Sequence, residues 1–298
     1  MKELELAAKY LNSGKKRLVR RDYQGAIADF TKAIEINPNY ATAYYNRSIA
    51  RHKLKDYQGA IADYNRSIEI NPNDATAYYN RGIPDVLLKN NQVPITDFIK
   101  AIEINPNYGE AYNNQGNSRA LLGDYQGAIA NFTTAIEINP KNSEAYNNRG
   151  LIHRQLKDYQ GAIADFTKAI EINPNHATAY YNRGNVRHEL KDYRGAIVDY
   201  TIAIEINPKD SQAYNNRGNA RTFLEDYHGA MTDFTKAIEI NPNYPEAYKN
   251  RGLARTFSGD KQRRIIADFQ KAAQLFEKQG REAEVQKTLE IIAKVKNL

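Results

Sequence analysis

Apolar side chains recur along this chain at helical spacing, and each apolar segment ends in the same way. In residues 22–39, Ala26, Phe30 and Ala33 form one stripe, because residues three and four apart share one face of an α-helix. The stripe ends at Asn37, which precedes a proline and therefore avoids the helical region of backbone space. The pattern predicts an amphipathic helix that stops at the Asn-Pro dipeptide.

A residue suited to capping opens each of these segments. Its short polar side chain can accept a hydrogen bond from an early backbone N–H of the helix. A second helical segment, such as 41–54, lies between each Asn-Pro and the next cap. Short connections between the two segments predict antiparallel helix pairs. The capping positions are Asp22, Asp56, Asn90, Asp124, Asp158, Asp192, Asp226 and Asp260.

The Asn-Pro dipeptide recurs every 34 residues, with its asparagine at 37, 71, 105, 139, 173, 207 and 241. A fixed period of this length is the signature of a solenoid, in which each unit buries its apolar face against its neighbours. We therefore predict eight tandem repeats within residues 1–278. Their boundaries are 7–40, 41–74, 75–108, 109–142, 143–176, 177–210, 211–244 and 245–278.

Residues 279–298 carry no Asn-Pro, and we expect them to form a capping helix. End repeats of a solenoid need a polar outer face. The apolar positions expected to pack inward are Val285, Leu289, Ile292 and Val295.

These repeats resemble the tetratricopeptide repeat (TPR) family over nearly the whole chain. Tyrosine stands where the family usually has tryptophan, and Arg149 stands where it usually has leucine. The resemblance implies an all-α, right-handed superhelical solenoid of helix-turn-helix repeats, with a concave groove lined by the first helices. It also implies a protein that binds peptides or other proteins and is not itself an enzyme. The matching positions in one repeat are Tyr146, Gly150, Tyr159, Ala162, Phe166 and Pro174.

One position of the first helix is asparagine in every repeat. At about 100° per residue, Asn46 lies on the side opposite Tyr44, which is expected to pack on the second helix. The asparagines should therefore face the groove. We call this set the ladder asparagines: Asn12, Asn46, Asn80, Asn114, Asn148, Asn182, Asn216 and Asn250.

An amide offers both a hydrogen-bond donor and an acceptor. A row of amides can therefore pair with the backbone of an extended peptide without reading its side chains, as similar asparagine rows do in the TPR family. The alternative is structural: each amide bonds to a neighbouring helix and sets the spacing of the repeats.

Positions beside the ladder divide the groove into an apolar and a polar stretch. The apolar stretch, in repeats two and three, contains Tyr45, Ile49, Tyr79, Ile83, Val86 and Leu87. The polar stretch, in repeats four to seven, contains Asn113, Asn117, Asn147, Arg154, Asn185, His188, Asn215 and Asn219. We expect an apolar anchor in the first and a polar segment in the second; alternatively, the exposed tyrosines are ordinary for this fold. The neighbouring residues expected to contact a peptide are Tyr45, Tyr79, Asn117, Asn185 and Asn219.

A recurrent arginine shares the inward face of the first helix, where an unpaired charge would be costly. An aspartate recurs on the second helix, as in Arg149 and Asp165. In repeat four both charges are absent together, replaced by Gln115 and Asn131. This covariation predicts a salt bridge within each repeat and a neutral amide pair in repeat four. In repeat one, Ser13 takes the arginine's position.

Repeat three departs from the pattern because Pro84 lies inside its first helix. An interior proline removes a backbone hydrogen bond, so a kink or an early break is expected there.

Composition narrows the function classes. The chain has no cysteine, which excludes disulfides and thiol chemistry. Its five histidines show no metal-binding spacing and there is no glycine-rich phosphate loop, so we expect no catalysis, metal or cofactor. No apolar run is long enough to span a membrane, and the first residues lack the apolar core of a signal peptide. These features favour a cytoplasmic protein.

The net charge of +7 is concentrated at the ends of the chain. The basic run at 15–21 is expected to be a solvated helix end and not a nucleic-acid site, since no aromatic–basic interleaving accompanies it. We therefore expect a monomeric scaffold for a protein or peptide partner whose identity the sequence does not reveal. The alternative is a self-associating structural scaffold whose groove is unused.

Overall fold

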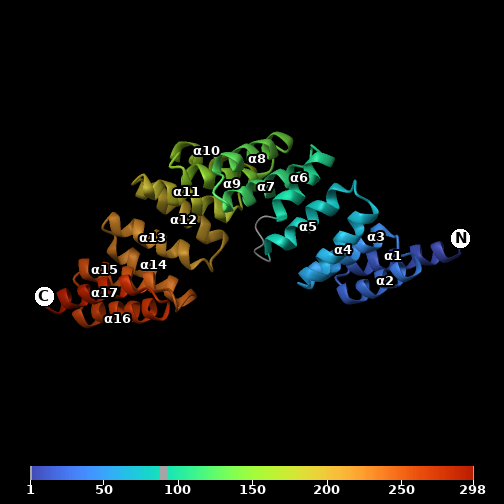
Figure 1. Ribbon diagram of the computed structural model, residues 1–298. Helices are drawn as coiled ribbons and strands as arrows, with labels where there is room; N and C mark the ends of the chain where they lie inside the picture. Colours follow the sequence, from blue (N-terminus) through green and yellow to red (C-terminus); the bar gives the residue numbers. More distant parts are fainter. Residues whose placement is uncertain (1, 88–92, 298) are drawn as a thin grey trace. The chain divides into compact units, whose positions relative to one another are not determined.

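The structure is a computed structural model that describes residues 2–87 and 93–297. These residues form seventeen helices and no strands (Figure 1), so the fold is all-α as predicted. The helices are α1 (Lys2–Val19), α2 (Tyr23–Ile36), α3 (Ala41–Lys53), α4 (Tyr57–Ile70), α5 (Ala75–Leu87), α6 (Val93–Ile104), α7 (Gly109–Leu121), α8 (Tyr125–Ile138), α9 (Ser143–Gln155), α10 (Tyr159–Ile172), α11 (Ala177–Glu189), α12 (Tyr193–Ile206), α13 (Ser211–Phe223), α14 (Tyr227–Ile240), α15 (Pro245–Phe257), α16 (Gln262–Lys278) and α17 (Glu282–Lys296).

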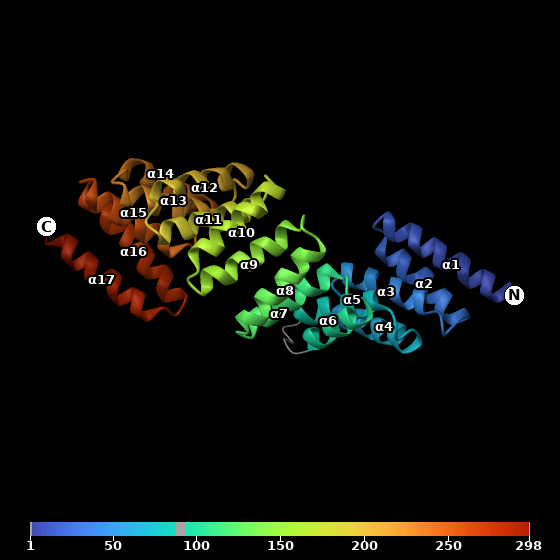
Figure 2. The same ribbon diagram turned by 90° about the horizontal axis from the view of Figure 1, so that it is seen from above.

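The chain divides into two compact units, Met1–Ile152 and His153–Leu298, and the division falls within α9. In the first unit, α1 packs on α2, α3 on α4, α5 on α6 and α7 on α8. The second helix of each pair then packs on the first helix of the next, as α2 does on α3. The second unit repeats this order from α10 to α16, and its last helix, α17, lies against α16 (Figures 1 and 2).

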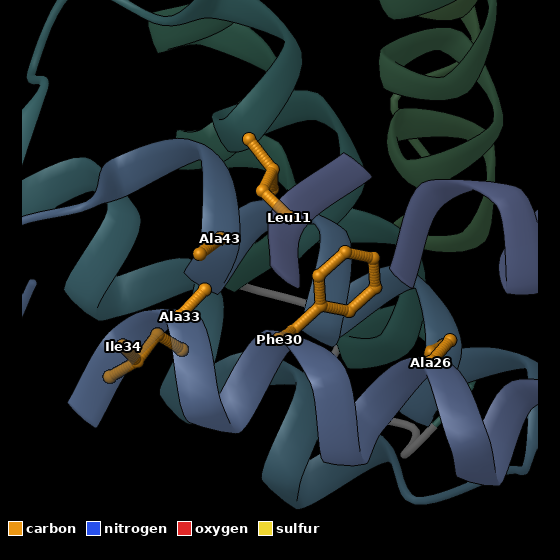
Figure 3. Close-up of a cluster of buried hydrophobic side chains, with 7 residues drawn as sticks. Leu11, Ala26, Phe30, Ala33, Ile34 and Ala43 are labelled. Carbon is orange, nitrogen blue, oxygen red and sulfur yellow. The ribbon is translucent and has the colours of Figure 1, made fainter. Parts of the chain in front are cut away.

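Each pair is held by a small core of alanines around one aromatic ring. In the first pair, Phe30 of α2 is fully buried against Leu11 of α1 and Ala26 (Figure 3). The ring leaves no room for a side chain on the facing helix. A Cβ added at Gly14 would lie 2.5 Å from the Phe30 ring, closer than two carbon atoms can approach without repulsion. This contact explains why a small residue recurs at this position.

The predicted caps are confirmed for six second helices. The Asp22 carboxylate accepts a 3.0 Å hydrogen bond from the Gly25 backbone N–H. The same cap forms at Asp56, Asp124, Asp158, Asp192 and Asp226. Asn90 lies outside the described residues.

The cap predicted at Asp260 is wrong. Helix α16 begins at Gln262, after the N-cap Lys261, because repeat eight has one more residue between the recurrent arginine and aspartate than the other repeats. The Asp260 carboxylate instead lies 3.4 Å from the guanidinium of Arg255.

The early break expected near Pro84 is also wrong, whereas the kink given as its alternative stays a prediction. Helix α5 continues through Pro84 to Leu87, and the proline is buried. Packing in the array therefore offsets the loss of one backbone hydrogen bond. Pro94, the other proline of this repeat, lies in the first turn of α6, where a missing N–H costs little.

The apolar face of α17 differs at one position from the prediction. Ile292 and Val295 are buried with Ile265 and Phe269 of α16, as expected. Leu289 is 45% exposed, and Thr288 is the buried residue of that turn. The helix is therefore rotated by about one residue from the orientation that the apolar pattern predicts.

Candidate functional site

Beneath the face of the first helices lies a row of buried ion pairs. In repeat two, Arg47 Nε and Nη2 donate to the two carboxylate oxygens of Asp63 at 2.8 and 2.7 Å. This two-pronged geometry is the strongest form of the arginine–carboxylate interaction. It confirms the predicted pairing within the repeat. The same pair forms at Arg81–Asp97, Arg183–Asp199, Arg217–Asp233 and Arg251–Asp268.

The remaining guanidinium nitrogen links one repeat to the one before it. Arg47 Nη1 donates to Thr31 Oγ1 at 3.0 Å, so one side chain joins two second helices. The predicted pair of Arg149 with Asp165 stays a prediction. Within the first unit, Arg149 Nη1 donates to Thr133 Oγ1 at 3.0 Å.

A second arginine, one turn further along the first helix, completes the arrangement, and the sequence reasoning missed its role. Arg51 Nη1 lies 3.0 Å from the Asp63 carboxylate. Its recurrence at the same spacing was the available signal. Equivalent contacts come from Arg187, Arg221 and Arg255. We call the two arginines and their aspartate the arginine clamp.

The neutral version predicted for repeat four is confirmed. Asn131 Nδ2 donates to Gln115 Oε1, and Arg119 Nη1 donates to Asn131 Oδ1 at 3.2 Å. In repeat one, Ser13 Oγ donates to Asp29 at 2.7 Å, in place of the arginine found elsewhere. The polar pairing is therefore kept at this position when the charges change.

The ladder asparagines connect consecutive first helices. Asn80 Nδ2 donates to Tyr45 Oη at 3.0 Å, and Asn114 Nδ2 donates to Tyr79 Oη at 3.1 Å. Each bond joins an asparagine to the residue 35 positions earlier, just before the ladder position of the preceding repeat. These bonds are the ones expected if the ladder sets the repeat spacing. Where the earlier residue is asparagine, its Oδ1 accepts instead: Asn148 to Asn113 at 3.2 Å and Asn250 to Asn215 at 3.0 Å.

The ladder positions differ in how far they are open to solvent. Asn12 is exposed, whereas Asn46 and Asn182 are buried, so not every member faces an open groove as expected. Asn46 Nδ2 donates to the Thr42 carbonyl oxygen of its own helix at 2.7 Å. The other members are half-buried.

In the half-buried members the two ends of the amide have different environments. The N–H end of Asn80 and of Asn114 is held by a tyrosine hydroxyl. No hydrogen bond to the Oδ1 atom of either residue is present among the residues that the structure describes. Asn80 and Asn114 therefore present acceptors whose orientation is fixed by their own N–H groups. The Oδ1 atoms of Asn148 and Asn216 instead accept from the neighbouring residues Asn147 and Asn215.

The neighbouring tyrosines of the first unit form an aromatic cluster. Tyr79 packs on Tyr108 and Phe98, with ring centroids 4.8 and 5.9 Å apart, and Tyr45 meets Tyr64 edge-on at 6.0 Å. Burial raises the pKa of the Tyr45 and Tyr79 hydroxyls. Both stay protonated at neutral pH and act as uncharged partners of the ladder.

In the second unit, the same face contains a polar cavity of about 180 Å³. At one end of it, Asn185 Oδ1 accepts from Tyr200 Oη at 2.8 Å and from Asn216 Nδ2 at 3.0 Å. The residues that line the cavity are Arg154, Asn185, His188, Glu189, Tyr200, Asn216 and Asn219.

Models of three tetratricopeptide repeat families match the chain. Tetratricopeptide repeat models cover residues 143–176, 177–210 and 211–244, and also 98–130. A TPR repeat model covers 20–55, 50–83 and 116–157. Together these matches span well over half of the chain.

The chain belongs to the tetratricopeptide repeat family.

Solved structures of other proteins agree with this fold. MamA has a TM-score of 0.53 at 25% identity, and the match covers 58% of this chain and 93% of MamA. A TPR protein from Parabacteroides merdae has a TM-score of 0.65 at 17% identity, covering 84% and 99%. YrrB, described as a TPR protein with an unusual peptide-binding site, has a TM-score of 0.51 at 23% identity, covering 62% and 95%. No curated protein sequence matches this chain.

The predicted contact residues of this TPR array fall into separate places. Tyr45 and Tyr79 lie in the aromatic cluster of the first unit. Asn117, on α7 of the same unit, is exposed. Asn185 and Asn219 meet in the cavity of the second unit. The sequence reasoning missed Glu189 and Tyr200 as cavity residues. For Tyr200 the available signal was a tyrosine at a position that is phenylalanine in most repeats.

The described residues show neither a membrane-spanning helix nor a metal-binding cluster. The helices within 2–87 and 93–297 include none long and apolar enough to cross a membrane. The same residues contain no group of three or more His, Asp or Glu side chains placed to hold a metal ion.

Proposed function

We propose that this chain is a protein-interaction scaffold that binds an extended segment of a protein or peptide partner along the face of its first helices. Membership of the TPR family supports this class of function, because TPR arrays commonly bind peptides in that groove. YrrB, which has a similar fold, is described as having a peptide-binding site. The identity of the partner is left open by this proposal.

The observation that carries the proposal is the one-sided use of the ladder amides. The Nδ2 groups of Asn80 and Asn114 are taken up by tyrosine hydroxyls, so their Oδ1 atoms point in a fixed direction. A fixed acceptor loses little conformational freedom when it binds. The backbone N–H groups of an extended partner are the donors that such a row would satisfy.

The spacing of the ladder favours a particular backbone conformation of the partner. Packed helices lie about 8–10 Å apart, so successive ladder amides should be separated by a similar distance. A polyproline II segment repeats every three residues, or about 9.3 Å, and so presents one N–H per repeat in the same direction. A flat β-strand alternates its N–H groups with a period of two residues and matches this spacing less well.

Affinity capture from the native lysate tests the proposal. The variant is Asn80→Ala with Asn114→Ala. The matched control is Asn73→Ala with Asn107→Ala, which changes two exposed asparagines in the turns just before the helices that carry Asn80 and Asn114. We expect the ladder variant to lose captured partners and the control to keep them. Equal capture by both would refute the ladder as a binding surface. A concentration-dependent dimer in light scattering would favour self-association instead.

A further inference from the structure

We propose that the cavity of the second unit is a side-chain subsite that takes a neutral carboxamide, the side chain of a glutamine in the bound segment. The inference rests on the proposed function for the presence of a segment in the groove. The chemistry of the cavity can be tested without that segment.

The size of the cavity suits one side chain. Its volume is about 180 Å³, whereas pockets for drug-sized ligands usually measure about 300–1,000 Å³. The lining residues come from α9, α11, α12 and α13 of the second unit. The cavity also contains the ladder residue Asn216, so a backbone bound at the ladder would place a side chain at its mouth.

The inner groups of the cavity already satisfy one another. Asn185 Oδ1 accepts from both Tyr200 Oη and Asn216 Nδ2. Asn216 Oδ1 accepts from Asn215 Nδ2 at 3.2 Å. These hydrogen bonds hold the inner side chains in place and leave few of their polar groups free to bind a ligand.

The groups that remain available lie at the rim. Arg154 Nε donates to Glu189 Oε1 at 2.9 Å, and Nη2 donates to the same oxygen. Among the described residues, no hydrogen bond is present to Arg154 Nη1, to Glu189 Oε2 or to the Asn219 side chain. A ligand therefore meets one cationic donor, one anionic acceptor and one amide.

The charges of this cavity cancel. Arg154 and Glu189 neutralise each other, and both are about one-third exposed. His188 adds no charge near neutral pH, because burial lowers the pKa of its imidazole, and its Nε2 is buried with no partner in the described chain. A carboxylate ligand would be attracted by Arg154 and repelled by Glu189. An ammonium ligand would be attracted by Glu189 and repelled by Arg154. Either would have to displace that like charge.

A primary carboxamide needs no such change. Its oxygen can accept from Arg154 Nη1 or Asn219 Nδ2, and its NH₂ group can donate to Glu189 Oε2 or Asn219 Oδ1. Charge-assisted hydrogen bonds on both sides make this match stronger than one between neutral groups. Glutamine is preferred to asparagine because its longer side chain reaches further from the backbone.

Small probes of identical shape and different charge test this subsite in the intact chain. The probes are the N-acetyl, N-methylamide derivatives of glutamine and glutamate, with binding followed by saturation-transfer NMR. We expect the glutamine probe to bind roughly tenfold more tightly than the glutamate probe, because a like charge beside Glu189 opposes the carboxylate. Equal binding of the two probes, or no binding of either, would overturn the proposal.

A charge-altering variant makes the test sharper. Glu189→Gln removes the anion and leaves Arg154 unpaired, so the preference should reverse towards the glutamate probe. The matched control is Glu205→Gln, at an exposed position of α12, which should leave the preference unchanged. Asn219→Ala should weaken the binding of the glutamine probe. A preference that does not move in Glu189→Gln would contradict the assignment.

The two proposals fail in different ways. If the ladder variant loses its partners while the glutamine probe does not bind the wild-type chain, the subsite is wrong and the scaffold function stands. Suppose instead that the glutamine probe binds, that the preference between the two probes reverses in Glu189→Gln, and that the ladder variant keeps its partners. The subsite then stands, and the ladder is not the binding surface.

Discussion

The same asparagine position is surrounded by an aromatic surface at Asn114 and by an amide surface at Asn250. Asn114 bonds to Tyr79, whose ring packs on Tyr108 and Phe98, whereas Asn250 bonds to Asn215. Asn216 combines the two, because its Nδ2 donates both to Tyr181 Oη and to Asn185 Oδ1. The hydrogen bond itself hardly changes. Its length is 3.1 Å from Asn114 to a tyrosine hydroxyl and 3.0 Å from Asn250 to an asparagine oxygen.

This difference shows that the contacts between repeats are independent of the side chains on the exposed surface. A tyrosine hydroxyl and an asparagine oxygen serve equally as the acceptor, so the residue beside the ladder can change its chemistry without changing how the repeats are joined. The arginine clamp lies beneath both surfaces. In repeat four the neutral amide pair of Gln115 and Asn131 replaces one ion pair, and Arg119 keeps its contact with Asn131. The repeats can therefore vary what they contact while their spacing stays fixed.

The largest effect should come from the clamp. Asp233 is buried and accepts from Arg217 and Arg221, so Asp233→Ala removes the buried carboxylate from two guanidinium groups and should cost about 3–5 kcal/mol. The neutral equivalent, Asn131→Ala, should cost about 1–3 kcal/mol. Urea unfolding followed by circular dichroism measures both. Equal shifts of the two midpoints would show that charge does not matter at this position.

A smaller effect should distinguish the two surfaces. Tyr79→Ala removes ring contacts with Tyr108 and Phe98 and should cost about 2–3 kcal/mol, below the range for a fully buried ring. Asn215→Ala removes only hydrogen bonds to Asn216 and Asn250 and should cost about 1 kcal/mol. The same urea experiment compares them. A larger loss for Asn215→Ala would reverse our view of which surface carries packing energy.

The exchange of acceptors can be tested at Asn113, which accepts from Asn148. Asn113→Tyr restores the arrangement of repeats two and three and should change the free energy of unfolding by less than about 1 kcal/mol. Asn113→Val keeps a side chain of modest size but offers no acceptor, and it should cost about 1–3 kcal/mol. If both variants are equally stable, the bond between first helices does not set the spacing.

The smallest effect concerns pH. Burial lowers the pKa of His188 in the folded chain, so the unfolded chain binds more protons once the pH falls below about 6.5. The folded state is therefore destabilised as the pH falls through that value. The melting temperature should drop less in His188→Gln than in the wild type between about pH 7.5 and 5.5. Identical drops in the two proteins would mean that His188 stays fully solvated.

The sequence predicted the parts of this molecule that repeat. The 34-residue period gave the helix pairs, and the joint loss of charge at Gln115 and Asn131 identified the partners of the buried ion pair. Both inferences compare the same position in several repeats, so neither depends on the residue at a single position. The second clamp arginine repeats as well, as at Arg51, but a helical wheel does not show that it reaches the same aspartate.

The features that were not predicted depend on depth, insertion and the meeting of several helices. A wheel gives the direction of Asn46 but not its burial. The extra residue before Asp268 shifts the start of α16 away from Asp260, and spacing alone conceals this shift. The cavity combines side chains of four helices, so its members share no periodicity.

In Asn80 and Asn114 the N–H group joins consecutive repeats, and we propose that the oxygen of the same amide binds a partner. The most direct test uses a peptide selected from a random library on the wild-type chain, with Kd and melting temperature measured for Tyr79→Phe and Asn114→Ala. Both variants break the same bond and should lower the melting temperature to a similar degree. We predict that Asn114→Ala raises Kd by roughly tenfold, while Tyr79→Phe changes it by less than about twofold. Equal effects of the two variants on Kd would contradict the account.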